Sequence, residues 1–404
     1  MYSFLKDQGY IYDSSLSGHV VYAHKGKKLK NKLEQYIRYL QQREDIMEIE
    51  SPLIYSKKVW EQSGHWTKFQ DPVVRTKNDK CYRLDKLIEK YTNTKYEIIT
   101  NWEQVQSILS KINAKESTFS KDPIIIKDEV EWKSLMMKTM SSHNEVGLRP
   151  ETATATYQNF EDLYISNGKQ FPIKVFQVGK SFRNEIATRH NLIRGREFTQ
   201  LETQIILPSE MKTVNILEHM EINMKQNIQL YDNKSNIELI TWQDLQDRFA
   251  LDITYFELLY LAYQILINLC IKPLSIRLRR HLDNEKAFYA LDAWDIEVNL
   301  KDIGWTEIGG VHDRGKYDLN KILGKKWHKK GIPHILEMAI GIDRLLYCIL
   351  DNLFEDKNVQ EGKSMLKIPY FLAPVQICVL PLIKNKVELC TMNDVLPALK
   401  DWVS

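Results

Sequence analysis

The sequence predicts a mixed α+β fold built on an antiparallel sheet with helices behind it. Residues 173–182 alternate in polarity as a strand does, and residues 196–207 form the expected return strand of the same hairpin. Residues 335–340 repeat this alternation, and residues 29–43 place apolar side chains at the spacing of one helix face. Strands of this kind bury one face under helices and leave the other face to line a polar cleft.

Composition excludes several classes of protein. A net charge of +3 over 404 residues is too mild for a strongly basic nucleic-acid binder, although a local basic patch stays compatible with it. The most apolar run, residues 255–271, is interrupted by Glu257 and is short for a membrane span, so we expect a buried helix and no membrane partner. Five cysteines without a Cys-x-x-Cys pair predict reduced thiols in a cytoplasmic protein.

Charged residues of two kinds meet in the predicted hairpin. Arg183 and Glu185 end its first strand, and Phe198 and Glu202 lie on its second strand. Arginines suit phosphates and carboxylates suit an ammonium group. A single Arg-Asn-Glu segment is more often a surface salt bridge. Here, however, Arg149-Pro150-Glu151 precedes it, and the segments 304–314 and 333–344 follow with further acids and arginines.

Taken in this order, these segments resemble the catalytic domain of class II aminoacyl-tRNA synthetases, and within that class glycyl-tRNA synthetase. The resemblance implies an enzyme that uses ATP and Mg²⁺ to activate an amino acid as its adenylate and then transfers it to tRNA. It implies catalytic roles for Arg183 and Arg344 at the α- and γ-phosphates, and an adenine site made by Glu185 and Phe198. Glu307, with Glu297 as a second carboxylate, is expected to hold the metal.

The resemblance also implies an amino-acid pocket for glycine. Its residues are Glu151, Glu202, Arg314, Glu337 and Ala339. Three carboxylates around one cavity repel one another unless a cation lies between them, so they are poor structural residues and good ammonium ligands. Ala339 stands where the family has a serine. Glycine is therefore the expected substrate, with this departure on the pocket strand.

The same resemblance divides the chain into four parts. Residues 1–70 match the motif 1 part of the catalytic domain, which implies a homodimer, and residues 71–139 are an insert with no predicted chemistry. Residues 140–367 form the catalytic core with motifs 2 and 3, and residues 368–404 resemble a truncated anticodon-binding segment. We therefore expect tRNA to be recognised through its acceptor end.

Two questions remain open at the level of sequence. The lysine-rich run 321–330 is predicted to be a loop, either solvated or in contact with phosphates of the acceptor stem. The aminoacyl acceptor could instead be a carrier protein, a peptide or a small amine. A non-catalytic accessory subunit with the same fold is a third possibility, against which the presence of Arg183, Glu185, Glu307 and Arg344 weighs.

Overall fold

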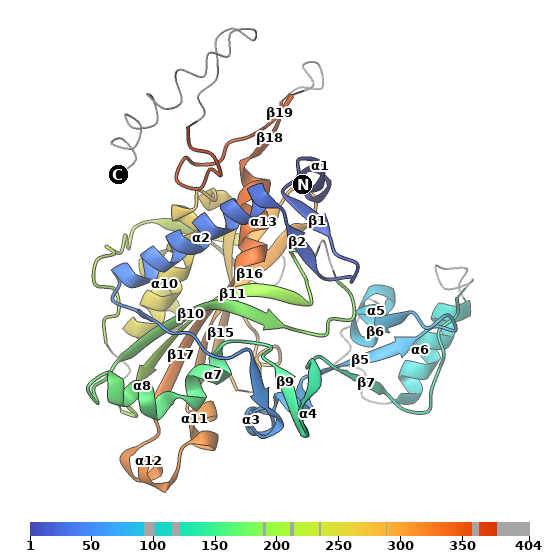
Figure 1. The fold of residues 1–404 in the computed structure, drawn as a ribbon, viewed down its shortest axis with the longest axis horizontal. Helices are drawn as coiled ribbons and strands as arrows, with labels where there is room; N and C mark the ends of the chain where they lie inside the picture. The colour runs from blue at the N-terminus through green and yellow to red at the C-terminus, as the bar shows by residue number, and fades with distance from the viewer. Residues whose placement is uncertain are drawn as a thin grey trace.

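A nine-stranded mixed sheet forms the centre of the protein (Figure 1). The computed structural model describes residues 1–92, 102–114, 122–188, 191–210, 214–233, 236–287, 289–357 and 363–377. The strands follow the order β13 (Ile237–Thr241), β12 (Asn227–Tyr231), β14 (Ile276–Arg280), β15 (Asp292–Leu300), β16 (Gly304–Gly315), β17 (His334–Gly341), β11 (Glu197–Leu207), β10 (Ile173–Phe182) and β3 (Met47–Glu48). Within these described strands, only the pairs β12·β14 and β10·β3 are parallel. The predicted α+β class and the long hairpin are confirmed.

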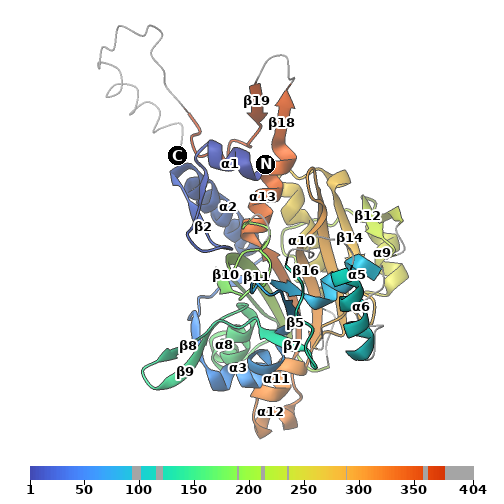
Figure 2. The ribbon, with the colours of Figure 1, turned by 90° about the vertical axis from the view of Figure 1, so that its right-hand side faces the viewer.

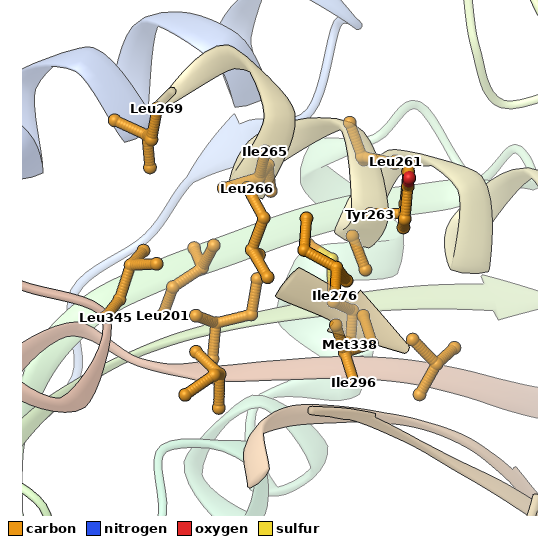
Figure 3. Close-up of a cluster of buried hydrophobic side chains, with 14 of the residues drawn as sticks. Leu201, Leu261, Tyr263, Ile265, Leu266, Leu269, Ile276, Ile296, Met338 and Leu345 are labelled. Atoms are coloured by element: carbon orange, nitrogen blue, oxygen red, sulfur yellow. The ribbon is translucent and has the colours of Figure 1, made fainter. Parts of the chain in front are cut away.

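Three helices cover one face of the sheet: α2 (His24–Arg43), α10 (Ile253–Asn268) and α13 (Ile342–Leu353) (Figures 1 and 2). The main hydrophobic core fills the space between them and the strands, where Leu266 of α10 lies above Leu201 of β11 and Met338 of β17 (Figure 3). The run that begins at Tyr255 is thus a buried helix, as predicted. Within the described ranges, we find no helix with the length and apolarity needed to cross a bilayer.

The opposite face of the sheet carries four short helices at one end, α7 (Ala153–Gln158), α8 (Phe160–Ser166), α11 (Tyr317–Ile322) and α12 (Lys325–Lys330). The expected loop at 321–330 is therefore wrong, because this segment is largely helical. Leu319, Leu323 and Trp327 recur every four residues and are buried, and the Trp327 ring lies 4.9 Å from that of Phe160. These apolar residues fold the segment back onto α8, while its lysines stay outside.

The predicted insert is a small α/β unit that projects from one side of the sheet (Figure 1). It combines β5 (Gln70–Arg75), β6 (Cys81–Arg83) and β7 (Glu131–Ser134) with α5 (Leu84–Thr92) and α6 (Trp102–Ala114), and has its own hydrophobic cluster. A second small sheet, β4 (Ile54–Ser56), β9 (Asn144–Leu148) and β8 (Lys138–Ser141), leads back to the main sheet beside α3 (Lys57–Ser63) and α4 (His65–Lys68).

The remaining elements lie near the N-terminus, beside β13 and beyond α13. They are α1 (Tyr2–Asp7), β1 (Ile11–Asp13), β2 (Val20–Tyr22), α9 (Trp242–Phe249) and the hairpin of β18 (Phe354–Lys357) and β19 (Lys363–Leu366). Most of the predicted anticodon-binding-like segment, residues 378–404, lies outside the described residues.

Candidate active site

A cavity of about 250 Å³ opens on the face of the sheet opposite the main core. Nine of the eleven residues predicted from sequence line it: Glu151, Arg183, Glu185, Phe198, Glu202, Glu307, Glu337, Ala339 and Arg344. Arg314 lies behind the wall and contacts Glu337. Glu297 is the exception, because its carboxylate accepts a 2.5 Å hydrogen bond from Arg277 and lies 3.7 Å from Arg279.

The alternation of side chains along a strand explains why these residues face the cavity. On β11, Phe198, Gln200 and Glu202 share the cavity face, whereas Leu201 and Ile205 enter the main core. The register then aligns one row across three strands, with Glu202 opposite Ala339 and Ala339 opposite Gly310. A Cβ added to Gly310 would lie only 2.9 Å from the His312 ring. The floor of the cavity beside Glu202 is therefore made by two of the smallest residues.

Glu337 is neutralised by a buried arginine. Arg314, which is 1% exposed, lies 3.2 Å from both carboxylate oxygens of Glu337 and also forms a paired contact with Asp318 at 2.9 and 3.1 Å. The Tyr157 hydroxyl donates a hydrogen bond to the Glu337 carboxylate at 2.9 Å. Burial alone would raise the pKa of Glu337, but Arg314 and His312 outweigh it and lower this pKa below its usual value. Glu337 is thus held as an anion.

Glu151, by contrast, contacts a histidine and a threonine. The Nε2 atom of His65 lies 3.5 Å from Glu151 Oε2, and Thr154 donates its hydroxyl to Oε1 at 2.8 Å. Ser63 contacts the other ring nitrogen of His65 at 2.8 Å and so fixes the orientation of the imidazole. Burial opposes ionisation here too, yet His65 and the more distant Arg314 hold the pKa of Glu151 well below its ordinary value.

Glu202 is the carboxylate that lacks such a partner. It accepts hydrogen bonds from Thr152, at 2.6 Å, and from Gln200, both of which are neutral. Among the described residues no cationic group lies within ion-pair distance of it. Burial, followed by the charges of Glu337 and Glu151, raises the pKa of Glu202 to about 8. The cavity therefore offers one buried carboxylate whose charge a positively charged ligand would stabilise.

Arginines line another part of the cavity. Arg183 donates its Nε to the Pro150 carbonyl at 3.1 Å and lies 5.4 Å from the centre of the Phe198 ring. In the described part of the chain it has no carboxylate within ion-pair distance, so its charge is available to an anion. Arg344 donates to the Ile193 carbonyl at 3.1 Å and to the Glu307 carbonyl at 2.5 Å, and lies 3.3 Å from the Glu307 carboxylate.

Next to Arg344, a buried network links four elements. The Asp343 carboxylate, at the first turn of α13, accepts hydrogen bonds from the Thr199 amide of β11 and from Lys30 of α2, both at 2.5 Å, and from Tyr22 of β2. Lys30 also donates to the Thr199 hydroxyl at 2.7 Å. Lys30 and Asp343 are both nearly inaccessible to solvent, and Asp343 and Thr199 line the cavity.

One predicted metal ligand fits the site better than the other. Glu307 is half exposed at the cavity wall and carries hard oxygen donors, and Mg²⁺ is commonly held by one or two carboxylates together with substrate phosphates. Glu297 lies opposite Glu307 in the register of β15 and β16 but is paired with Arg277. No cluster of three or more metal-binding side chains occurs among the residues that the structure describes.

Sequence reasoning missed four residues of this site: Lys30, His65, His312 and Asp343. Each acts through a partner distant in sequence, so no role was predicted for it, although His312 and Asp343 lie in the segments that carry the resemblance. Lys30 did leave one signal, because its spacing from Leu33 and Ile37 places this lysine on the buried face of α2. A charge on such a face requires a buried partner.

The fold and the cavity together define an α+β protein whose central sheet carries one cavity lined by both carboxylates and arginines. The profile described as tRNA synthetase class II core domain (G, H, P, S and T) matches residues 137–353, more than half of the chain. The protein belongs to this family.

Curated relatives and solved structures add two further findings. A glycine-tRNA ligase of Thermococcus gammatolerans is 28% identical to the chain, over 89% of the chain and 78% of the ligase. A glycine-tRNA ligase of Mycoplasmopsis synoviae is 29% identical, over 94% of the chain and 80% of the ligase. A Giardia lamblia prolyl-tRNA synthetase in complex with prolyl-adenylate has the same fold, with a TM-score of 0.59 and 14% identity over 99% of the chain. A Cryptosporidium parvum prolyl-tRNA synthetase complexed with halofuginone and AMPPNP gives a TM-score of 0.56. The chain spans about three fifths of these two structures, at 61% and 60%.

Proposed function

We propose that this protein activates glycine with ATP and transfers it to tRNA. The observation that carries the proposal is the division of the cavity into an acidic end, with Glu151, Glu202 and Glu337, and an arginine-lined end, with Arg183 and Arg344. An amino acid presents an ammonium group and a carboxylate, and ATP presents phosphates. A cavity with both kinds of charge can hold both substrates with their reacting groups adjacent.

The acidic end suits a small amino acid. Glu202 is proposed to bind the ammonium group. Glu337 pairs with Arg314 at 3.2 Å, and Glu151 lies 4.0 Å from the same arginine. Glu202, in contrast, has the neutral Thr152 and Gln200 as partners. Ala339 and Gly310 form the floor beside it, and buried side chains close the wall behind. The glycine-tRNA ligases among the curated relatives support the same choice of substrate.

The arginine-lined end is proposed to hold ATP for attack by the amino-acid carboxylate on the α-phosphate. This reaction forms the aminoacyl-adenylate and releases pyrophosphate. Arg183 would contact both the carboxylate and the α-phosphate, which places the reactants and stabilises the charge that develops between them. Phe198, next to Arg183, would stack on adenine, and Glu185 would accept a hydrogen bond from the adenine amino group. Arg344 would turn from Glu307 to the γ-phosphate.

A magnesium ion is proposed to bind at Glu307, with Glu297 as a further ligand only if its contact with Arg277 opens. When bound, the ion supplies positive charge that neutralises the phosphate oxygens. The chain's own contribution at this position is the Glu307 carboxylate, which lies 3.3 Å from Arg344 and can exchange that contact for another cation.

The partners follow from the same proposal. The tRNA would approach through its acceptor end, with Lys325, Lys326, Lys329 and Lys330 of α12 as candidate phosphate contacts. A homodimer would form through α2 and the strands after it, where Met47, Leu53 and Ile54 are exposed apolar side chains. A cytoplasmic location agrees with the free thiols of Cys81, Cys270 and Cys348.

Charging of tRNA tests this proposal. Purified protein, ATP, Mg²⁺ and unfractionated tRNA are incubated in turn with each radiolabelled amino acid, and acid-precipitable label is counted. Glycine should label the tRNA well above the other amino acids, and Arg183→Ala should abolish this labelling. Efficient labelling by a bulky amino acid instead of glycine would refute the assignment of the acidic end.

A further inference from the structure

We infer that Lys30 of α2 is a positioning residue for ATP, because it neutralises the carboxylate of Asp343, which lines the cavity next to Arg344. The arginine-lined end, where ATP is proposed to bind, is called the ATP end below, and the acidic end is called the glycine end. The inference rests on the proposed function for its ligand. Lys30 lies outside residues 137–353, the part of the chain that the family profile matches. It is also outside every segment for which the sequence predicted a role at the site.

The contacts place Asp343 between the two proposed ATP-binding elements. Its carboxylate accepts the Thr199 amide at 2.5 Å, directly after Phe198 on β11, and its own backbone precedes Arg344 on α13. This carboxylate thus joins the strand that carries the adenine contact to the helix that carries the phosphate contact.

A carboxylate at this point would repel phosphates unless a cation compensated it. Asp343 is 4% exposed, so solvent screens its charge poorly. The groups that face it are the Lys30 ammonium at 2.5 Å from α2, the Tyr22 hydroxyl from β2, and the amide of Thr199 from β11. Lys180 of β10 adds a weaker, more distant positive charge. Among the described residues, Lys30 is therefore the one full positive charge in direct contact with Asp343.

The known contacts of Lys30 all belong to this network. Its side chain is 3% exposed, it donates to Asp343 and to the Thr199 hydroxyl, and its ammonium lies 4.5 Å from the centre of the Tyr22 ring. A buried ammonium with these partners fixes Thr199 and Asp343 relative to α2. Its removal should therefore change the electrostatic potential at the ATP end and leave the glycine end, where Arg314 pairs with Glu337, unaltered.

Three variants separate compensation of charge from a merely structural role. In Lys30→Met, Asp343 loses its cation. In Lys30→Met/Asp343→Asn, both charges are absent, and in Asp343→Asn alone only the negative charge is removed. Lys174→Met is the matched control, because Lys174 of β10 is also a buried lysine but does not line the cavity. Its ammonium donates to the Glu44 carbonyl at 2.9 Å and lies 3.1 Å from Glu218.

The experiment measures ATP affinity by calorimetry, KM for ATP and for glycine by pyrophosphate exchange, and Tm. Lys30→Met should weaken ATP binding roughly tenfold. This is the effect expected when the uncompensated charge of Asp343 repels one phosphate charge about 10 Å away at an effective dielectric constant of about 20. KM for glycine should change less than about twofold, and the double variant should recover ATP affinity. Asp343→Asn should bind ATP at least as tightly as the wild type, and this measurement tests the inference even if Lys30→Met does not fold.

Several results would overturn the inference. Equal weakening of ATP binding in Lys30→Met, in Asp343→Asn and in the double variant would mean that the network acts only by packing. Unchanged ATP affinity in folded Lys30→Met, or the same loss in Lys174→Met, would also refute it. If the wild type binds ATP and activates no amino acid, the proposed function fails and the affinities still decide the role of Lys30. If the wild type does not bind ATP, both fail.

Discussion

Replacing Glu202 by glutamine removes one ionisable carboxyl group from the buried acidic end while keeping the side chain's shape. Glu202 is 4% exposed, and burial together with Glu337 and Glu151 raises its pKa from 4.5 to about 8. Between these two pH values the folded protein keeps a proton that the unfolded chain has already released. The free energy of unfolding of the wild type therefore falls through this group as the pH rises across that window.

The size of the effect follows from the same numbers. Each full pH unit in the window is worth about 1.4 kcal/mol. The group is partly ionised in the unfolded chain at pH 5 and in the folded protein at pH 8, so the wild type should lose about 3–4 kcal/mol between these pH values through Glu202. Glu202→Gln lacks this loss. For a chain of this size, its advantage in Tm over the wild type should be about 3–4 °C greater at pH 8 than at pH 5.

The same substitution should impair activity while it increases stability. Loss of the proposed charged hydrogen bond between Glu202 and the ammonium group should raise KM for glycine by about a hundredfold in pyrophosphate exchange. Glu337→Gln is the control, and its effect on Tm should be opposite to that of Glu202→Gln. It leaves the buried Arg314 with one carboxylate fewer, so Tm should fall at both pH values. A Tm difference between Glu202→Gln and the wild type that does not change with pH would refute the argument.

Three further predictions concern the other parts of the site. Arg183→Ala and Arg344→Ala should each lower pyrophosphate exchange by about a hundredfold or more at unchanged Tm, since each removes a proposed charge contact to the reacting phosphates; near-normal rates would show that the ATP end is misassigned. Ala339→Ser narrows the floor opposite Glu202 and should raise the ratio of kcat/KM for glycine over alanine; a lower ratio would contradict this geometry. A fourfold alanine variant of α12 should raise KM for tRNA and make this KM less dependent on salt, without changing adenylate formation; the substituted residues are Lys325, Lys326, Lys329 and Lys330. If the KM for tRNA depends on salt as steeply as in the wild type, α12 does not contact the tRNA.

The sequence was most informative where a single element determines where a side chain points. The alternation on β11 placed Phe198 and Glu202 on the cavity face and Leu201 in the core, and the structure has this arrangement. The same logic held for Glu337 and Met338 on β17. The cavity-lining residues of these two strands could therefore be predicted, although their individual roles remain predictions.

Features that depend on pairing between distant elements could not be derived in this way. Glu297 was expected to face a metal, but the register sets it beside Arg277 of the neighbouring strand. Neither the contact between Lys30 and Asp343 nor that between His65 and Glu151 follows from a local pattern. The loop expected at 321–330 failed for a related reason: Trp327 gains its buried surface from Phe160, far away in sequence.

Pyrophosphate exchange across all amino acids tests the central claim most directly, because it needs neither tRNA nor any assumption about the acceptor. Wild-type protein is incubated with ATP, Mg²⁺ and labelled pyrophosphate, with one amino acid at a time, and label in ATP is measured. The proposed site predicts exchange with glycine that exceeds exchange with every other amino acid and disappears in Arg183→Ala. No exchange with any amino acid by folded protein that binds ATP, or stronger exchange with a bulky amino acid than with glycine, would contradict it.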